Sequence, residues 1–518
     1  MKLIKLLKNV EYRLMSGDID TQVTGVNVDS RLVKSGDIYV AIRGFHVDGH
    51  DYAKEALSRG AVAVIACEGF SGADGAEAVI CVPDTRIALS AIVNNFYGNP
   101  SKKFNLVGVT GTNGKTSVSV IIDHILRFMG RKTGLITTIE TYCGGEAVPM
   151  RKTTPTTPDC VELGEMMSLM EKNGVDDMVM EVSSMGLKTH RVDACHFDVG
   201  VFTNISPEHL DDHGSMEDYV GSKLLLFKMA NGAVVNVDDD FSGQVTEMCE
   251  GKETIRYGIM NKDDCDLYAD RINFSDKEVS FDIIYRRKEG AGREVGVHDV
   301  QGHLPAISKI SISLNIPGQF AVYNLLAAVG ACLLLGFELN SMEHALADEI
   351  DIPGRYEQLK SGGVTAIIDY AHTPMALENL LETVSRNKAY NGIICVFGCG
   401  GDRDDGRRAP MGEISGRLSD VTIITSDNPR TEDPRKIIAD IEAGARSSGG
   451  KYKIEQDREK AITMALKAAK PGMAVVIAGK GHENYQVLGH ETIHFDDREV
   501  VREVFHSISN GGKSGNEK

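Results

Sequence analysis

The sequence predicts an α/β protein of three domains, and three features of the chain support that class. Its 518 residues are too many for one hydrophobic core, while a hydrophobic content of 42% and a charged content of 25% are those of an ordinary globular protein. From about residue 104 to the end, apolar strand-like runs alternate with helical patterns, which is typical of parallel βαβ units. A glycine-rich turn joins the first of these strands to a helix. We expect the domains to span 1–103, 104–336 and 337–518.

The first domain is expected to combine short strands with few helices. The sequence begins with MKLIKLLKNV, which resembles an amphipathic helix. Four strand-like runs (VTGVNVDS, DIYVAI, AVAVIA and AVICV) are separated by glycine turns and by one helical stretch, DYAKEALSRG. The polar, turn-rich segments Val26–Arg31 and Arg43–Tyr52 are suited to binding a ligand, although ordinary surface loops explain them equally well.

The second domain opens with a stretch typical of nucleotide binding, FNLVGVTGTNGKTSVSVIIDHILRFMG (Phe104–Gly130). An apolar strand leads into a glycine-rich turn, where the backbone can approach an anion and the next helix offers free N–H groups. Lys115 can reach the terminal phosphates of a nucleotide, and the Thr116 hydroxyl can bind magnesium. Val109 stands where the strict P-loop pattern has its first glycine. A solvated lysine on an ordinary turn would not explain why glycines, a lysine and hydroxyls converge at one helix start.

Polar side chains follow the later strands of this domain, where a parallel sheet binds its ligands. Glu181 ends the apolar strand MVMEVSS and is predicted to bind a metal ion; pairing with a core cation is the alternative. His209 and His213 follow the next strand, in SPEHLDDHG, and His209 is the one favoured as a site residue. Lys223 lies in the helical stretch YVGSKLLLF, where a lysine usually extends its charge to water.

Two other segments complete the second domain. Residues 263–309 are polar with alternating strand character, and we expect them to form an antiparallel excursion from the sheet. Residues 317–336, PGQFAVYNLLAAVGACLLLG, are expected to form the helix that closes the domain.

The third domain is predicted to be a second parallel α/β unit. Its strands TAIIDY, GIICVFGC, VTIITSD and AVVIAG end in polar residues, at the edge where open parallel sheets bind ligands. The turns GCGGDRDDGRR, SDNPRTEDPR and AGKGHENYQ then bring fixed cations together with carboxylates. Those residues are Arg403, Arg430, Lys480, Asp427, Asn428 and Glu483. This mixture suits a zwitterionic ligand such as an amino acid, whereas surface ion pairs on loops are the alternative.

Composition excludes several classes of partner. The net charge of −18 argues against nucleic acid and an anionic membrane surface, but not against a small anionic substrate in a basic pocket. The ten cysteines form no CxxC pair, and no signal-peptide pattern or bilayer-length apolar run is found. We therefore expect a cytoplasmic protein without membrane insertion.

Taken together, the motifs resemble those of the Mur ligases, the ATP-dependent amide-bond-forming enzymes of peptidoglycan synthesis. In the family's order they are VGVTGTNGKTS, TTPD, MEVSS, FTNISPEHLDDHG, PGRYE, DYAHTP, GCGGDRD, DNPR and GKGHE, and they span nearly the whole chain. The GTNGKT variant of these ligases also accounts for Val109. The resemblance implies a UDP-binding N-terminal domain, a central P-loop parallel-sheet ATPase domain and a C-terminal Rossmann-like α/β domain that binds an amino acid. It also implies a monomer.

The resemblance implies a role for each matching position. The uridine nucleotide would be contacted by Ser30, His46 and Val47. The muramoyl-dipeptide would be held by Thr156, Thr157, Ser183 and Arg191. ATP would be bound by Gly111, Thr112, Asn113, Gly114, Lys115, Thr116, Ser117, Asn324, Arg355 and Asp369. One magnesium ion would be held by Thr116 and Glu181, and a second by His209 and a carbamylated Lys223. The incoming amino acid would be bound by Arg403, Asp427, Asn428, Pro429, Arg430, Gly479 and Glu483. The catalytic residues would be Lys115, His209 and Lys223.

Arg430 indicates which amino acid to expect. Within the family, the chain looks most similar to members that add meso-2,6-diaminopimelate, whose far carboxylate a guanidinium can hold with two hydrogen bonds. Lysine would present only an ammonium group there, and lysine-adding members lack this arginine. The sequence also departs from the family pattern. Met185 stands where histidine is common, Pro207 and Glu208 replace a frequent Arg-Asp, and Thr189 stands where glutamine can occur.

The reaction that the resemblance implies begins when the D-glutamyl carboxylate of UDP-N-acetylmuramoyl-L-alanyl-D-glutamate attacks the γ-phosphate of ATP, giving an acyl phosphate and ADP. The amine of diaminopimelate then attacks the acyl carbon, and phosphate leaves. The same ligase adding L-lysine is one alternative. A folylpolyglutamate synthase-like ligase is another, and it would need neither the DNPR motif nor a UDP-binding first domain. A non-catalytic nucleotide-binding regulator would not need the complete set of P-loop and metal-binding residues.

Overall fold

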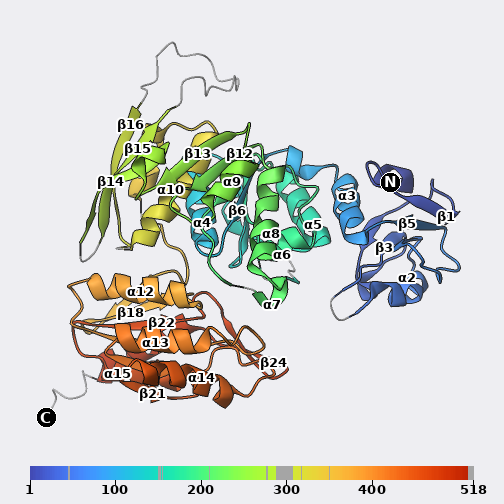
Figure 1. Ribbon diagram of the computed structural model, residues 1–518. Helices are drawn as coiled ribbons and strands as arrows, with labels where there is room; N and C mark the ends of the chain where they lie inside the picture. Colours follow the sequence, from blue (N-terminus) through green and yellow to red (C-terminus); the bar gives the residue numbers. More distant parts are fainter. Residues whose placement is uncertain are drawn as a thin grey trace.

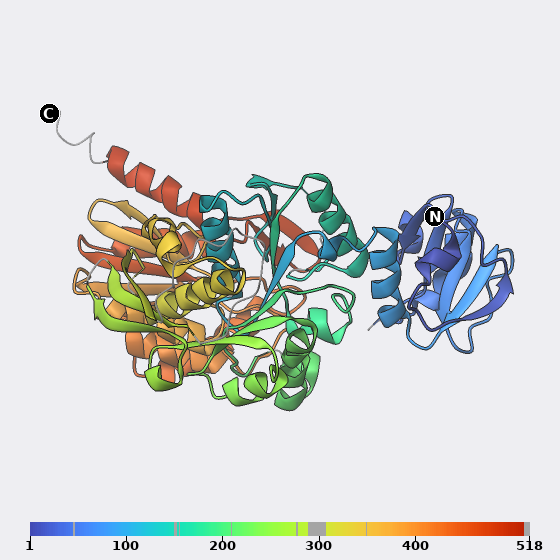
Figure 2. The ribbon, with the colours of Figure 1, turned by 90° about the horizontal axis from the view of Figure 1, so that it is seen from above.

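Three sheets follow one another along the chain in the computed structural model (Figure 1). The structure describes residues 1–44, 47–149, 153–154, 156–208, 210–275, 278–287, 307–316, 318–348 and 350–511. Within these residues the strands form a five-stranded first sheet, an eleven-stranded central sheet, a six-stranded third sheet and a two-stranded hairpin. The unit built on the first sheet projects to one side of the other two in both views (Figure 1, Figure 2). The predicted α/β class is confirmed.

The first sheet has the strand order β1–β5–β4–β3–β2. The strands are β1 (Arg13–Gly17), β2 (Gly25–Asn27), β3 (Asp37–Val40), β4 (Ala63–Cys67) and β5 (Ala78–Val82), and the accompanying helices are α1 (Leu3–Leu6), α2 (Ala53–Ser58) and α3 (Thr85–Phe96). All neighbours pair parallel except β1, which runs antiparallel to β5. The four expected strands are confirmed as β2 to β5. β1 was not predicted, because its side chains are all exposed and its sequence shows no apolar alternation.

The central sheet has the order β16–β15–β14–β13–β12–β11–β6–β10–β7–β8–β9. Its parallel strands are β6 (Asn105–Thr110), β7 (Thr133–Ile136), β10 (Asp177–Glu181), β11 (Val199–Phe202), β12 (Gly232–Asn236) and β13 (Glu253–Gly258). On one side the sheet is extended by the antiparallel strands β8 (Thr141–Cys143) and β9 (Glu146–Ala147). On the other side β14 (Leu267–Phe274) pairs parallel with β13, and β15 (Val279–Arg286) and β16 (Ile307–Leu314) then continue the sheet antiparallel. The expected antiparallel excursion is confirmed for its described residues.

The carboxyl ends of three central strands meet at one edge of this sheet. β6 lies between β10 and β11, with Glu181 opposite Val109 and Phe202 opposite Thr110. Because the three strands are parallel, the turn after β6, Glu181 and the loop after β11 emerge side by side, at the edge where such sheets bind ligands.

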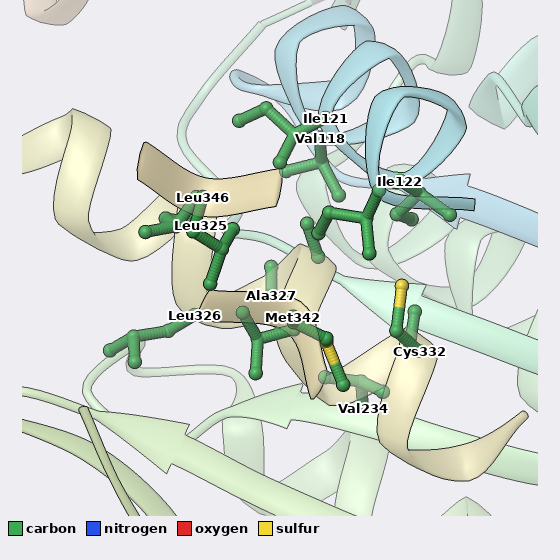
Figure 3. Packing of buried hydrophobic residues seen from close by; sticks show 14 of the residues in the cluster. Val118, Ile121, Ile122, Val234, Leu325, Leu326, Ala327, Cys332, Met342 and Leu346 are labelled. Carbon is green, nitrogen blue, oxygen red and sulfur yellow. The ribbon is translucent and has the colours of Figure 1, made fainter. Parts of the chain in front are cut away.

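Helices cover both faces of the central sheet. They are α4 (Lys115–Phe128), α5 (Cys160–Lys172), α6 (Ser184–Lys188), α7 (Leu210–His213), α8 (Met216–Met229), α9 (Ser242–Met248) and α10 (Gln319–Leu334). Figure 3 shows Val118 and Ile121 of α4 packed toward Leu325 of α10, while α5 and α8 build the core of the opposite face. Leu346, in α11 (Glu343–Ala347), belongs to the same core as α4 and α10, so the chain beyond α10 stays packed on the central unit.

The third sheet has the order β17–β18–β22–β19–β20–β21. Its strands are β17 (Glu357–Ser361), β18 (Val364–Asp369), β19 (Gly392–Phe397), β20 (Val421–Ile424), β21 (Tyr452–Ile454) and β22 (Met473–Ala478), and all neighbours are parallel except β17 and β18. Helices α12 (Pro374–Arg386), α13 (Arg408–Leu418) and α14 (Pro434–Ser447) cover one face, and α15 (Arg458–Ala468) and α16 (Asp497–Gly511) cover the other. The hairpin joins β23 (Tyr485–Leu488) to β24 (Glu491–His494). The four strands expected here are confirmed as β18, β19, β20 and β22.

None of the helices in the described part of the chain is both long enough and apolar enough to span a bilayer.

Candidate active site between the central and third sheets

The turn between β6 and α4, the P-loop turn Gly111–Lys115, has the strand–turn–helix context that the sequence predicts. Gly111 and Gly114 have φ values of +148° and +86°, a region that favours glycine. A Cβ atom on Gly111 would lie 1.9 Å from Thr203 Oγ1, and one on Gly114 would lie 2.5 Å from Asn324 Oδ1. The turn is therefore packed closely against the loop after β11 and against α10, and a larger residue would displace it.

The loop after β11 fixes this turn through several hydrogen bonds. The Thr112 N–H donates to the Asn204 carbonyl over 2.7 Å, and the Asn113 N–H donates to Asn204 Oδ1 over 3.0 Å. The Thr203 hydroxyl donates to the Asn113 carbonyl over 2.7 Å. Asn113 Nδ2 is buried without a hydrogen-bond partner among the described residues, and it lies in the wall of a cavity that could take a polar ligand.

Two lysine amino groups meet at one backbone carbonyl of the P-loop turn. Lys115 Nζ donates to the Gly111 carbonyl over 3.0 Å and to the Thr112 carbonyl over 2.8 Å, and Lys223 Nζ donates to the same Gly111 carbonyl over 2.7 Å. Burial lowers the pKa of both amines, and the charge of Lys115 lowers the pKa of Lys223 further, to well below its ordinary value, although Glu208 opposes this. Lys223 thus does not extend to water, and two positive charges here would repel each other.

Glu181 lies at the end of β10 with 1% of its surface exposed. Its carboxylate accepts hydrogen bonds from the Thr138 N–H, over 2.8 Å, and from the Thr138 hydroxyl, over 3.2 Å. Among the described residues no Lys, Arg or His lies within ion-pair distance of Glu181, although from further away its charge opposes the lowering of the Lys115 pKa by burial. Nor do the described residues contain a ready group of three His, Cys, Asp or Glu side chains for a metal ion. His209, the other expected metal ligand, lies outside the described residues.

A cavity of about 710 Å³ opens between the P-loop turn and the third sheet. It brings together most of the residues expected to bind ATP, and those in its wall are Asn113, Gly114, Ser117, Asn324, Arg355 and Asp369. Arg355 comes from the segment before β17; its Nη2 donates to the Thr116 hydroxyl over 3.2 Å, and its guanidinium lies 4.5 Å above the Tyr370 ring. Asp369 accepts hydrogen bonds from the Tyr356 and Ala371 N–H groups, both over 2.8 Å, and burial raises its pKa.

A second cavity, of about 420 Å³, joins the P-loop turn to the turns of the third sheet. The predicted site residues in its wall are Thr112, Asn113, Gly114, Lys115, Thr116, Thr156, Glu181, Arg355, Arg403, Asp427, Asn428, Arg430, Gly479 and Glu483. Residues expected to bind phosphate and residues expected to bind an amino acid therefore line one space. Three further site residues do not line this cavity. Gly111 and Pro429 lie in the same turns, and Lys223 donates to the P-loop turn from α8.

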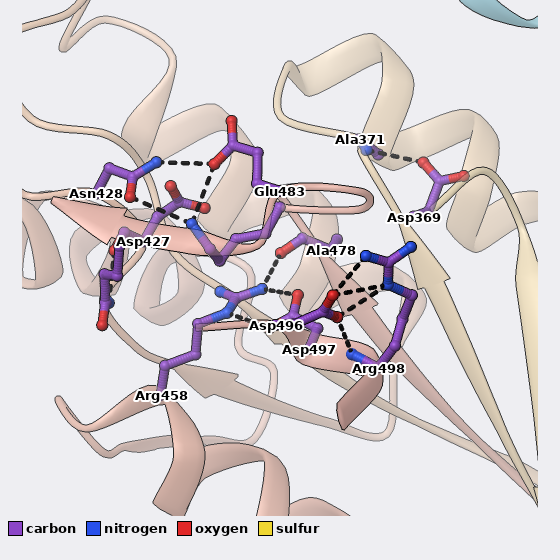
Figure 4. Close-up of polar contacts among 12 residues, drawn as sticks. Asp369, Ala371, Asp427, Asn428, Arg458, Ala478, Glu483, Asp496, Asp497 and Arg498 are labelled. Atoms are coloured by element: carbon purple, nitrogen blue, oxygen red, sulfur yellow. Dashed lines mark hydrogen bonds and ion pairs between the residues drawn. The ribbon is translucent and has the colours of Figure 1, made fainter. Parts of the chain in front are cut away.

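The third-sheet side of this second cavity contains a buried polar cluster around Lys480, whereas Arg403 in the same wall is exposed. Lys480 is fully buried and donates to Glu483 Oε2 over 3.0 Å and to Asn428 Oδ1 over 3.2 Å. Asn428 Nδ2 also donates to Glu483 Oε2, over 2.9 Å (Figure 4). Arg430 has a left-handed φ of +52° and donates from Nη1 to the Gly401 carbonyl over 2.7 Å. Arg430 is thereby held in place at the cavity wall.

The residues expected to hold the muramoyl-dipeptide form a hydrogen-bonded group beside Glu181. The Thr157 hydroxyl donates to the Glu181 carbonyl over 3.0 Å, and the Ser183 N–H donates to the Thr157 hydroxyl over 2.9 Å. Arg191 Nη1 donates to the Thr157 carbonyl over 2.9 Å, and Thr156 lines the second cavity.

The residues expected to bind the uridine nucleotide lie in the first unit, apart from both cavities. Ser30 is buried and donates to Glu55 Oε2 over 2.8 Å, while Val47 is 54% exposed. His46 lies outside the described residues. Figure 2 shows this unit projecting away from the central sheet, so a ligand that reached both regions would have to be long.

Sequence patterns missed several residues of the second cavity. Tyr370 and His372 line it, and His372 Nε2 lies 3.2 Å from Glu208 Oε1 across the two units. The motif DYAHTP contained both residues, but nothing in its pattern indicated a partner far away in the chain. Glu208, which departs from the family pattern, thus contacts the third unit directly. Two other positions that depart from the family pattern contact each other. The Thr189 hydroxyl donates to the Met185 carbonyl over 2.6 Å, one helical turn earlier.

Comparisons with known proteins cover all three units. Residues 22–97 match the model of the Mur ligase family catalytic domain, residues 109–332 the Mur ligase middle domain, and residues 354–481 the Mur ligase glutamate ligase domain. A protein of Caldanaerobacter subterraneus subsp. tengcongensis named UDP-N-acetylmuramoyl-L-alanyl-D-glutamate–2,6-diaminopimelate ligase is 42% identical over 506 residues, covering 97% of this chain and 99% of the relative. A Clostridium acetobutylicum protein with the same name and the number 2 is 41% identical over 507 residues, 97% of this chain and all of the relative.

A solved structure with that enzyme's name also superposes over almost the entire chain. Its TM-score is 0.66 at 29% identity, covering 98% of this chain and 99% of the other. Full-length relatives at this level of identity and matches to all three domain models lead to one conclusion: the chain belongs to the Mur ligase family.

Proposed function

We propose that the chain is an ATP-dependent ligase that joins meso-2,6-diaminopimelate to the D-glutamyl carboxylate of UDP-N-acetylmuramoyl-L-alanyl-D-glutamate, for peptidoglycan synthesis. The observation that carries this proposal is the second cavity, whose wall combines Lys115, Thr116 and Glu181 with Arg430 and Glu483. The two half-reactions require that the groups that bind phosphate and the groups that bind the incoming amino acid face one space. The names of the full-length relatives support the same substrates.

In the first half-reaction, the D-glutamyl carboxylate attacks the γ-phosphate of ATP to give an acyl phosphate and ADP. Lys115 stabilises the charge on the transferring group, and the backbone N–H groups at the start of α4 hold the phosphates. Arg355 and Asp369 line the first cavity from the third unit and would contact the same nucleotide. The acyl phosphate is thereby formed where two units meet, which limits its exposure to water.

The chain has oxygen donors that suit magnesium. The Thr116 hydroxyl and the Glu181 carboxylate both line the second cavity, and Glu181 has no ion pair among the described residues. We propose that these two residues hold one ion, and that His209 and a carbamylated Lys223 hold another. Bound magnesium would neutralise charge on the phosphates.

In the second half-reaction, the amine of diaminopimelate attacks the acyl carbon. Asp427 and Glu483 line the second cavity and would hold the ammonium group that does not react, and Arg403 and Arg430, in the same wall, would hold the carboxylates. Lys480 and Asn428 donate to the same oxygen of Glu483, which holds the carboxylate at the cavity wall. We propose that Pro429 and Gly479 shape this pocket, since a Cβ atom on Gly479 would lie 2.7 Å from Asp427 Oδ2.

The remaining predictions become part of the proposal. Ser30, His46 and Val47 would bind the uridine nucleotide, and Thr156, Thr157, Ser183 and Arg191 the muramoyl-dipeptide. We propose domains over 1–103, 104–336 and 337–518, with the segment up to Ile352 still packed on the central core. All ten cysteines are described and none forms a disulfide, which supports a reducing compartment such as the cytoplasm. The monomer stays a prediction that light scattering can test.

Substitution of Arg430 by alanine tests the proposed amino acid. We expect kcat/KM for diaminopimelate to fall about 100-fold, on the order of 3 kcal/mol, because a two-bond contact with its far carboxylate is lost. Phosphate release would be measured with diaminopimelate, lysine and ornithine, each with ATP and the UDP-dipeptide. Wild type should prefer diaminopimelate strongly, and Arg430→Ala should lose most of that preference.

Arg435→Ala is the matched control, because Arg435 is exposed and pairs with Asp433 at the start of α14. It should leave the preference unchanged. A wild-type enzyme that used lysine as well as diaminopimelate would support the lysine-adding alternative. No phosphate release with any UDP-dipeptide, but release with a folate substrate, would support the folylpolyglutamate synthase-like alternative.

A further inference from the structure

The third unit contains a buried ion pair that the proposed reaction does not use. Arg458, the first residue of α15, and Asp497, the first residue of α16, both have fully buried side chains. Arg458 Nε lies 2.8 Å from Asp497 Oδ1, and Nη2 lies 2.7 Å from Asp497 Oδ2, so the contact has two parallel hydrogen bonds. Burying two charges is expensive, and such pairs often add no stability over apolar residues of similar size. A role in positioning other groups would account for the pair.

The pair holds the backbone directly before one amino-acid turn. Arg458 Nη2 also donates to the carbonyl of Ala478, over 3.0 Å, and Ala478 is the last residue of β22 (Figure 4). The next residue, Gly479, has a φ of +113° and begins the turn that carries Lys480 and Glu483. Arg458 therefore fixes the point at which the chain leaves the sheet.

The start of α16 holds the other end of the same turn. Arg498 forms an ion pair with Asp496, and its Nη2 also donates to the carbonyl of His482, over 3.4 Å. His482 directly precedes Glu483. The end of the turn at Glu483 is thus hydrogen-bonded to the segment around Asp497, whereas the chain before its start is hydrogen-bonded to Arg458, the ion-pair partner of Asp497.

The segment before Arg458 holds the second amino-acid turn. The carbonyl of Gln456 accepts hydrogen bonds from the Ser426 N–H, over 3.3 Å, and from the Thr425 hydroxyl, over 3.4 Å. Asp427 and Asn428 follow immediately. One stretch, Gln456–Arg458, therefore contacts the chain just before each of the two turns that supply the acidic and amide groups of the cluster.

Charge supports the same arrangement. Burial alone would lower the pKa of Arg458, but the Asp497 carboxylate, with smaller contributions from Asp427 and Glu483, raises it overall. Arg458 is thus a permanent positive charge behind two carboxylates that face the second cavity.

We propose that the Arg458–Asp497 pair is a positioning element of the amino-acid site, which sets the spacing between the turns Asp427–Arg430 and Gly479–Glu483. This inference rests on the proposed function for the identity of the amino acid, but not for the geometry of the two turns. Arg458 lines neither cavity and acts through Ala478. The Gly479 N–H also donates to the Asp369 carbonyl, over 3.1 Å, but the turn itself carries Lys480 and Glu483, so we expect the larger effect on binding of the amino acid.

The test compares Arg458→Met/Asp497→Leu, which removes both charges together, with Arg458→Lys, which keeps the charge and loses the two-bond contact. We expect the double variant to unfold cooperatively near the wild-type temperature, because no lone charge is left buried. Its KM for diaminopimelate should rise at least about 10-fold, while its KM for ATP stays within about twofold. Arg458→Lys should show a smaller rise in the same constant. Amide hydrogen exchange in residues 426–430 and 479–483 should increase in the double variant, with the P-loop turn unchanged.

Arg131→Met/Asp177→Asn is the matched control, because it too removes both charges of a pair with a buried carboxylate, here in the central unit, 2.6 Å from Arg131 Nε to Asp177 Oδ2. It should change neither Michaelis constant. Unchanged exchange and an unchanged KM for diaminopimelate in the double variant would overturn the inference; if that variant does not fold, the same result in Arg458→Lys would do so. Wild-type enzyme that did not use diaminopimelate would instead refute the proposed function, and hydrogen exchange would still decide the role of the pair.

Discussion

Lys115→Met is expected to lower kcat about 1,000-fold, on the order of 4 kcal/mol, because it removes a positive charge from the transferring phosphate. Lys115 Nζ is fixed by the Gly111 and Thr112 carbonyls at the wall of the second cavity, where little water screens it. Methionine retains most of the side-chain volume, so the P-loop turn should keep its shape. Phosphate release at saturating substrates would measure the effect.

Stability gives this prediction a second readout. In Lys115→Met the Gly111 carbonyl still accepts a hydrogen bond from Lys223, but the Thr112 carbonyl loses its lysine donor. The unfolding temperature of Lys115→Met should therefore fall only slightly, as expected for the loss of one hydrogen bond. Lys132→Met is the control, because Lys132 donates to the Asn173 carbonyl at an exposed position and should retain full activity. A Lys115→Met enzyme with more than about a tenth of wild-type turnover would contradict the assigned role.

Local sequence determined the P-loop turn well enough to predict it. An apolar strand, glycines at Gly111 and Gly114 with positive φ, and a helix starting at Lys115 are all consequences of neighbouring residues. The same holds for the strands of the third sheet, whose apolar runs are bounded by polar turns. By contrast, β1 carries no apolar alternation, since all its side chains are exposed, and pattern reasoning did not find it.

The contacts between the P-loop turn and the third unit could not be predicted in this way. Arg355 contacts Thr116 and His372 contacts Glu208 across large separations in sequence, and both contacts depend on how the third sheet is placed against the central one. No periodicity encodes that placement. Family resemblance did bring Thr116 and Arg355 to one nucleotide, because it carries three-dimensional information that the local pattern lacks. It gave no role to Glu208, His372 or Arg458.

Two lysines with similar sequence surroundings also have different neighbours in the structure. Lys223 and Lys480 both lie in stretches where a lysine could extend to water, yet both are almost completely buried. Their neighbours differ: Lys480 contacts the carboxylate of Glu483, whereas Lys223 contacts a carbonyl that already binds Lys115. One lysine is therefore neutralised by its partner, and the other is left in repulsive surroundings.

This repulsion leads to the second large prediction, that Lys223→Ala lowers kcat about 100-fold or more. Burial and the charge of Lys115 favour the neutral amine of Lys223, which is the form that reacts with carbon dioxide. The resulting carbamate would replace a cation beside Lys115 with an anion, and would supply an oxygen donor for magnesium. Lys223→Glu, which supplies a carboxylate on a shorter side chain, should retain more activity than Lys223→Ala.

Carbon-13 NMR of enzyme prepared with labelled bicarbonate measures the modification directly, and the signal should disappear in Lys223→Ala. Lys228→Ala is the control on the same helix, because Lys228 is exposed and should keep both the signal and the activity. Depletion of bicarbonate should slow wild type but not Lys223→Glu, since only the lysine has to be modified to become an anion. Equal activity of Lys223→Ala and wild type, or a wild-type enzyme without a carbamate signal at full activity, would show that the buried amine serves the P-loop turn as a hydrogen-bond donor alone.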